Sequence, residues 1–99
     1  MIIVTGSVTA RPDAFETLLD ASLAHVARSR LERGCISHSV QTDCENPLRL
    51  FFFERWTDTA KLKVRLRQPG TTEFMAAVRA GAAATEAVEV YQADLADMA

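Results

Sequence analysis

Apolar and polar residues alternate with a period of two in several stretches of the chain, which predicts β-strands. The clearest stretches are residues 2–9, 35–42 and 48–56, and the third is the most strongly apolar. Residues 87–94 alternate weakly and are predicted to form a last strand. Residues 43–47, which join the second and third stretches, favour a turn, so these two strands are expected to form an antiparallel hairpin.

Between the strands, apolar residues recur every three to four positions, as on one face of an α-helix. The longest such segment, residues 13–32, follows Pro12 and ends before Gly34, a residue suited to a helix C-terminus. Two shorter helices are predicted, one from residue 57 or 58 to about residue 68, and one that begins at residue 71 or 72. The apolar residues expected on the buried sides are Phe15, Leu18, Leu19, Leu23, Val26, Ala27 and Leu31 in the first helix, Leu62 and Leu66 in the second, and Phe74, Met75 and Val78 in the third.

The resulting order of elements, β-α-β-β-α-α-β, is that of a split βαβ arrangement. It predicts an α+β fold of the ferredoxin-like type, with one four-stranded antiparallel sheet and the helices on one of its faces. The 99 residues are enough for one domain, residues 1–99, and they contain no linker or low-complexity tract.

The third predicted strand is apolar on both faces, unlike a strand with one face in water. Leu50, Phe52 and Trp56 alternate with Phe51 and Phe53. Two or three helices cover only one face of such a sheet, so the second pair of rings would form an exposed apolar patch. The simplest cover is the same face of a second copy, which predicts a homodimer with paired sheets. The alternative is that one ring packs beneath the C-terminal segment.

Charge and composition narrow the possible partners. The net charge is -2 and acidic and basic residues are interspersed, which argues against a nucleic acid or an anionic membrane surface as partner. The basic cluster Lys61, Lys63, Arg65 and Arg67 is interpreted as a solvated helix face. No apolar run approaches the roughly 20 residues of a membrane span, and the first eight residues are too short for a signal peptide. We therefore expect a cytoplasmic protein.

The two cysteines, Cys35 and Cys44, form no C-x-x-C motif, and no histidines stand at zinc-binding spacing from them. A disulfide is not expected in a reducing compartment. We predict no metal site, and Cys35 is interpreted as a small buried strand residue.

The chain resembles the antibiotic biosynthesis monooxygenase family, whose members are also called dimeric α+β barrel proteins. The resemblance covers nearly the whole chain, and its motifs are Gly34-Cys35-Ile36, Phe53-Glu54-Arg55-Trp56, Leu62, Leu66, Pro69 and Phe74. It implies a pocket between the sheet and the helices of each subunit. Better-known members oxidise quinols or aromatic polyketides with O2 and no flavin, haem or metal. Others degrade haem, and some act on small signalling sugars without oxidation.

Two departures from the family pattern bear on the expected activity. Many relatives place a histidine directly after the proline that opens the third helix, where this chain has Gly70. Haem-degrading relatives also use an asparagine on the first strand, at a position matched here by Gly6 or Ser7. Both differences argue against haem degradation, and the first removes a candidate catalytic residue.

Oxygenation without a cofactor requires a base that removes a substrate proton, and an apolar pocket with little water. His38 and Glu54 are the candidate bases. His38 lies mid-strand between Ile36 and Val40, so it is expected to point inward; the alternative is a core histidine without a catalytic role. Glu54 shares a face with Trp56, where burial would raise its pKa; the alternative is an ion pair or hydrogen bond with a neighbouring element.

Other residues are expected to surround this pair. His25 lies at the edge of the first helix's apolar stripe and is expected to be half exposed; the alternative is that it reaches the pocket rim. Arg55 is expected to point toward the dimer face, together with Phe51 and Phe53. The candidate substrate contacts, for each of which core packing is the alternative, are Trp56, Phe52, Phe74 and Tyr91.

The leading hypothesis is a cofactor-independent monooxygenase that acts on a small quinol or phenolic ring. One alternative is a non-catalytic dimer that binds a small hydrophobic molecule. The other is a non-oxidative enzyme, such as an isomerase of a small carbonyl compound.

Overall fold

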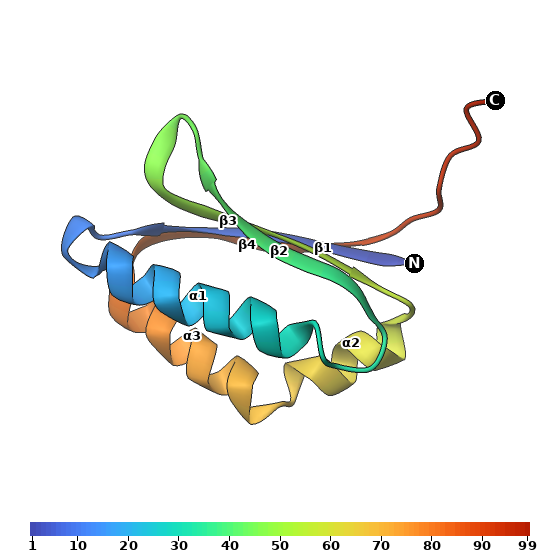
Figure 1. The fold of residues 1–99 in the computed structure, drawn as a ribbon, viewed down its shortest axis with the longest axis horizontal. Helices are drawn as coiled ribbons and strands as arrows, with labels where there is room; N and C mark the ends of the chain where they lie inside the picture. Colours follow the sequence, from blue (N-terminus) through green and yellow to red (C-terminus); the bar gives the residue numbers. More distant parts are fainter.

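The sheet lies on one side of the molecule and all three α-helices lie on the other (Figure 1). In this computed structural model, which describes residues 1–99, the strands are β1 (Ile2–Ala10), β2 (Cys35–Asp43), β3 (Asn46–Trp56) and β4 (Ala82–Gln92). The helices are α1 (Phe15–Ser29), α2 (Thr59–Leu66) and α3 (Pro69–Gly81), and a short 3-10 turn, η1 (Pro12–Ala14), precedes α1. The strand order is β2-β3-β1-β4 and every pairing is antiparallel. The predicted α+β, ferredoxin-like fold and the order of its elements are confirmed.

Local signals explain most element boundaries. Asp58 begins α2, because its carboxylate accepts a hydrogen bond from the backbone N–H of Lys61 at 2.8 Å. Pro69 opens α3, ahead of the predicted start, at a position where a missing N–H costs nothing. Helix α1 ends at Ser29, before the predicted residue 32. Strand β4 begins at Ala82, earlier than predicted, because a run of alanines gives no alternation to detect.

Gly34 adopts a backbone conformation that is strained for other residues. Its φ is +89°, and an added Cβ would lie 2.5 Å from Cβ of Lys61. Gly34→Ala is therefore expected to lower the free energy of unfolding by about 1–3 kcal/mol, measured by urea denaturation. Gly81→Ala is the matched control: its Cβ would come no closer than 3.4 Å to a neighbour, so a change below about 1 kcal/mol is expected. Equal losses in both variants would contradict the prediction.

The core fills the space between the sheet and the helices in two clusters. The larger cluster comprises Val8, Ala10, Leu18, Val26, Leu50, Phe52, Phe74 and Val78. The smaller comprises Ile2, Val4, Trp56 and Leu62. The predicted inward face of the third strand is thus confirmed, whereas Phe51 and Phe53 lie on the face that no helix covers.

Helix α1 is rotated relative to the prediction. Leu23 was expected to be buried but is 51% exposed, and Leu31, expected on the same face, lies beyond the end of the helix and is 90% exposed. The buried side instead carries Ser22, His25 and Ser29 among its apolar residues. Its packing against both the sheet and α3 decides this rotation, and it brings polar side chains into the interior.

Further apolar predictions were wrong, among them Ala27 of α1 and Met75 of α3, which are both exposed. Ile36 is 46% exposed, because a bulge between Cys35 and Ser37 shifts the alternation of β2. Leu66 is 53% exposed at the end of α2. Arg65 takes an inner position on that helix and is only 6% exposed, so the interpretation of the basic cluster as solvated is wrong for this residue.

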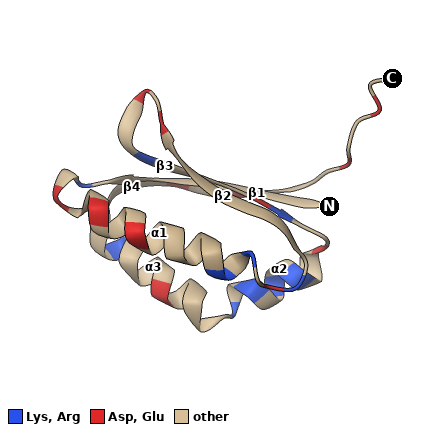
Figure 2. Ribbon diagram, viewed as in Figure 1, with Lys and Arg blue, Asp and Glu red and all other residues tan.

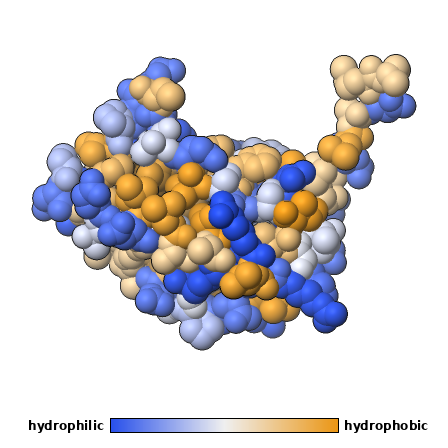
Figure 3. Space-filling model, viewed as in Figure 1, coloured by the Kyte–Doolittle hydropathy of each residue, from blue (hydrophilic) through white to orange (hydrophobic).

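Basic side chains gather at one end of the molecule, on α2 and the turn that follows α1 (Figure 2). In the space-filling view hydrophilic and apolar side chains are intermixed at this end, while apolar side chains gather beside the β2–β3 hairpin, above α1 (Figure 3). None of the helices is long and apolar enough to cross a membrane. Helix α2 therefore combines a solvated basic surface with one buried arginine.

Candidate active site

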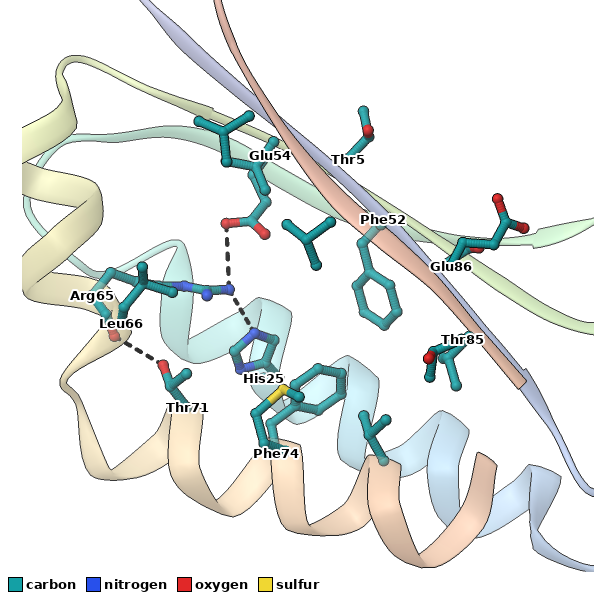
Figure 4. A pocket seen from close by; sticks show the side chains of 18 of the residues that line it. Thr5, His25, Phe52, Glu54, Arg65, Leu66, Thr71, Phe74, Thr85 and Glu86 are labelled. Carbon is teal, nitrogen blue, oxygen red and sulfur yellow. Dashed lines mark hydrogen bonds and ion pairs between the residues drawn. The ribbon is translucent and has the colours of Figure 1, made fainter. Parts of the chain in front are cut away.

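A cavity of about 350 Å³ lies between the sheet and the helices, a volume suited to a small ligand. Glu54 from β3, Arg65 from α2 and His25 from α1 meet in it (Figure 4). Thr5 and Glu86 also border the cavity, but their side chains point to the far side of the sheet (Figure 4). Most of the wall is apolar and is formed by Val4, Val8, Phe52, Leu62, Leu66, Phe74, Met75, Val78, Val88 and Val90.

Arg65 connects the other two ionisable residues. Its Nη2 lies 3.3 Å from Oε1 of Glu54 and donates to Nε2 of His25 at 2.6 Å. All three residues are buried, with at most 6% of each exposed. Because a guanidinium can only donate, Nε2 of His25 must accept, and the proton of the neutral imidazole is on Nδ1.

Aromatic packing holds this group in place. The ring of His25 stacks on Phe74, with centroids 4.1 Å apart and planes 7° from parallel. Phe74 meets Phe52 edge-on at 5.5 Å, and the guanidinium of Arg65 lies 5.9 Å from the ring of Trp56. These contacts come from α1, α2, α3 and β3, so the site forms only when the whole core does.

Glu54 has the environment of a proton acceptor. Its Oε1 accepts a hydrogen bond from Nε1 of Trp56 at 2.9 Å, and its Oε2 lies 3.6 Å from Nε2 of His38. Burial raises the pKa of Glu54, and the opposing effects of Arg65 and of the Trp56 hydrogen bond do not cancel this increase. A carboxyl group with a raised pKa on a cavity wall is suited to accept a proton from a bound ligand.

Both histidines are held neutral. Burial is the main cause, and the positive charge of Arg65 adds to it; together they lower the pKa of His25 and of His38 to about 3. Neither ring nitrogen of His38 has a hydrogen-bond partner. A group that ionises so far below neutral pH is a weak base, so of the two predicted bases Glu54 fits the role better.

Acidification is expected to destabilise the fold through these histidines. Each stays neutral in the folded protein down to about pH 3, whereas in the unfolded chain it binds a proton below its ordinary pKa of 6.5. The unfolded state therefore binds more protons between these values, and stability falls by about 2 kcal/mol per histidine from pH 7 to pH 5. The raised pKa of Glu54 acts in the opposite sense, because the folded protein then binds that proton more readily.

Urea unfolding of wild-type protein and of His38→Phe at pH 7 and pH 5 isolates one of these contributions. The replacement removes no hydrogen bond, since both nitrogens of His38 are unpaired. The variant is expected to lose about 2 kcal/mol less than wild type over this pH interval. An identical loss in the two proteins would contradict a depressed pKa for His38.

Three of the predicted site residues line the cavity: Glu54, Phe52 and Phe74. His38 and Trp56 do not. They lie behind Glu54 and contact its carboxylate, because the neighbouring strand and the smaller core cluster enclose them. Their contribution is to the surroundings of Glu54 and not to the cavity wall, contrary to expectation.

Tyr91 is also absent from the cavity wall. It pairs with Ile3 on β1 and is 45% exposed. Its neighbour in β4, Val90, lines the cavity, and successive side chains of a strand point to opposite faces. Tyr91 therefore belongs to the open face of the sheet.

The sequence prediction missed Arg65 as a site residue and favoured a surface position for His25 over one at the pocket rim. His25 was expected to be half exposed but is 4% exposed. One signal was available: His25 follows the buried Leu18 by seven positions and Arg65 follows the buried Leu62 by three, spacings that place each pair on one helix face.

The geometry defines a small α+β domain with a buried carboxyl group on an apolar cavity. The family model for antibiotic biosynthesis monooxygenases matches residues 1–77, and the chain belongs to this family. An uncharacterized protein of Synechocystis sp. (strain ATCC 27184 / PCC 6803 / Kazusa), sll1783, is 34% identical over 74 residues, which are 75% of this chain and 50% of the relative. The chain thus spans about half the length of that relative.

Solved structures share the fold over nearly the entire chain. A candidate antibiotic biosynthesis monooxygenase from Deinococcus radiodurans has a TM-score of 0.91 at 22% identity, with 98% of this chain and 96% of that chain covered. Rv0793 from Mycobacterium tuberculosis has a TM-score of 0.86 at 26% identity, with 99% and 98% covered. Monooxygenase is the activity for which this family is named, and membership supports that class of activity without indicating a substrate.

Proposed function

We propose that this chain is a monooxygenase that oxidises a small quinol or phenolic ring with O2, without a cofactor, and that Glu54 is its base. One observation carries the proposal: a buried carboxyl group with a raised pKa opens onto an apolar cavity lined by Phe52 and Phe74. Removal of a ring hydroxyl proton makes the ring electron-rich enough to pass an electron to O2. The apolar wall offers few polar groups to hold water beside the reactive intermediate.

The reaction of a quinol balances without another reductant. The quinol supplies two electrons when it becomes a quinone and two more when a ring C–H becomes C–OH. One atom of O2 enters the ring, and the other leaves as water with two hydrogens from the quinol. The products are a hydroxyquinone and water.

Oxygen consumption by the purified, chelator-treated protein with a panel of hydroquinones tests this proposal. The expected result is consumption of one O2 per quinol and, with isotopically labelled O2, one labelled atom in the product. No consumption by the folded protein with any quinol would contradict it. Saturable binding without a product would then favour a binding protein, and hydrogen exchange into a carbonyl substrate without O2 use would favour an isomerase.

We also propose that the chain works as a homodimer that pairs through the open face of the sheet. Phe51 and Phe53 are partly exposed on this face, and no helix covers it. Nε of Arg55 donates to Oγ of Ser37 at 2.8 Å on the same face, so this guanidinium is already engaged within its own subunit. A two-fold contact would place the aromatic rings of one copy against those of the other and remove both from water.

Phe53→Asp is expected to convert the dimer to a monomer, because it places a charge within the apolar contact. Sedimentation velocity at micromolar concentration measures this change. Leu23→Asp is the matched control: Leu23 is 51% exposed on α1, on the helical side, so its replacement should leave the dimer intact. Wild-type protein that sediments with the mass of one chain would contradict the proposal.

A further inference from the structure

Arg65 is a buried cation with unused hydrogen-bond donors. Its Nη2 makes both of its side-chain contacts, to Glu54 and His25, and its Nε is buried without a partner. A guanidinium carries five N–H donors, and buried donors are nearly always paired. Arg65 also lines the cavity, and its Nη1, which makes no hydrogen bond and is not enclosed as Nε is, is the donor to which a ligand could supply an acceptor.

We propose that the cavity binds its ligand as an anion: Arg65 holds the negative oxygen of a weakly acidic hydroxyl group, a phenol or an enol, whose proton resides on Glu54. This inference rests on the proposed function in that Glu54 accepts the proton. It concerns binding and ionisation, and it requires no reaction with O2. It restricts the ligands to compounds with an ionisable hydroxyl group and excludes neutral rings without one.

The charges around Glu54 favour one anion in the cavity at a time. The ionisable groups that influence Glu54 or its neighbours come from α1, α2 and β2: Arg65 of α2, His25 and Arg28 of α1, Arg30 and Glu32 just after α1, and Cys35 and His38 of β2. Both histidines are neutral, so Arg65 is the buried cation that faces Glu54. A ligand that entered as an anion would place a second negative charge beside Glu54, at a large cost in free energy.

A neutral acid avoids this cost. When it gives its proton to Glu54, the negative charge moves from the carboxylate to the ligand oxygen and the net charge of the site does not change. Arg65 then exchanges one anionic partner for another. His25 supports this exchange, because its Nε2 accepts from Nη2 of Arg65 and its neutral ring adds no charge.

Titration with 4-nitrophenol under nitrogen tests the inference, because the ionised form of this phenol absorbs at longer wavelength than the neutral form. At a pH below the phenol's own pKa, the bound probe is expected to show the phenolate band. Little or no proton should be released to the solution, since Glu54 takes it. 4-Nitroanisole, which has no acidic proton, reports the fit of the ring to the cavity.

Variants separate the roles of the two charged residues. Arg65→Met is expected to bind the probe as the neutral phenol, with its affinity for 4-nitroanisole within about twofold of wild type. Glu54→Gln is expected to keep the phenolate band and to release one proton for each ligand bound, because 4-nitrophenol, unlike a quinol, is acidic enough to ionise beside Arg65 without a base from the protein. Arg67→Met, a change at an exposed arginine just after α2, should behave like wild type.

Arg65→Met leaves the carboxylate of Glu54 without its cation, which weakens the fold. The double variant Arg65→Met with Glu54→Gln removes both charges and gives the same optical test in a protein without the buried pair. It is also expected to bind the neutral phenol.

A neutral-phenol spectrum in wild-type protein, or a phenolate band of equal strength in Arg65→Met, would overturn the inference. Failure of the proposed function gives a different result: O2 consumption would be absent while the phenolate band remained. The two outcomes are separable because the titration contains no O2 and requires no turnover.

Discussion

Glu54→Gln is expected to lower kcat/KM for quinol oxidation by about 100- to 10,000-fold, the usual contribution of a general base. Glutamine has nearly the same shape and retains an oxygen to accept the hydrogen bond from Trp56, but it cannot take a proton. Binding of a ring without an acidic hydroxyl should change little. An oxygen electrode at pH 7 measures the rate.

The pH dependence distinguishes a lost base from a damaged pocket. At a pH high enough to ionise the quinol in solution, the variant should recover much of its rate, because the protein no longer has to remove the proton. Glu45→Gln is the matched control, since Glu45 is exposed in the β2–β3 turn and its replacement should leave the rate unchanged. A wild-type rate in Glu54→Gln at pH 7 would eliminate Glu54 as the base.

Arg65→Met is expected to lower the free energy of unfolding at pH 7 by about 3–5 kcal/mol, because removing one partner of a buried ion pair leaves the other charge uncompensated. The carboxylate of Glu54 would keep only the hydrogen bond from Trp56, and Nε2 of His25 would lose its donor. The deficit should shrink as the pH falls and Glu54 becomes protonated. Urea denaturation across the pH range measures it.

The double variant, in which Glu54→Gln accompanies Arg65→Met, should regain a large part of this loss, because no unpaired charge is then buried. Arg67→Met, at the exposed arginine, should stay within about 0.5 kcal/mol of wild type. If the double variant were no more stable than Arg65→Met alone, the loss would come from packing and not from charge.

Local patterns predicted much of the fold. The alternation in β3 placed Leu50, Phe52 and Trp56 on one face, and the residues after Asp43 indicated the hairpin turn. Gly34 was expected at a helix end, but α1 ends at Ser29, and the positive φ of Gly34 instead serves the turn that leads into β2. Each of these signals depends on neighbouring residues alone, which is why the sequence suffices to detect it.

The rotation of α1 could not be predicted in the same way. Leu19 and Leu23 suggested one buried side, and Leu19 does pack against the core while Leu23 is exposed, because a helix that packs against both a sheet and another helix is oriented by all of its contacts. Ser22 satisfies its hydroxyl by donating to the backbone carbonyl of Leu18 at 2.7 Å. The hydroxyl of Ser29 is buried without a hydrogen-bond partner, a cost that the close packing of this helix must offset.

The sequence predicted only part of the candidate site, because the remaining residues depend on partners from distant elements. Glu54 was identified because its position in β3 sets the face on which it lies. Arg65 and His25 are 40 residues apart in the sequence. Their burial is stabilised by polar contacts, because Arg65 contacts both His25 and Glu54. A buried polar group depends on partners from distant elements, and a single sequence gives no direct sign of such a partnership.

Trp56 is the only tryptophan of the chain, and its indole N–H donates to the carboxylate oxygen that also faces Arg65. Indole fluorescence responds to the charge of its hydrogen-bond partner. The emission of this one chromophore should therefore change whenever Glu54 gains or loses a proton. The protein thus carries an intrinsic optical reporter of its own carboxyl group, which can be followed during rapid mixing without any added label.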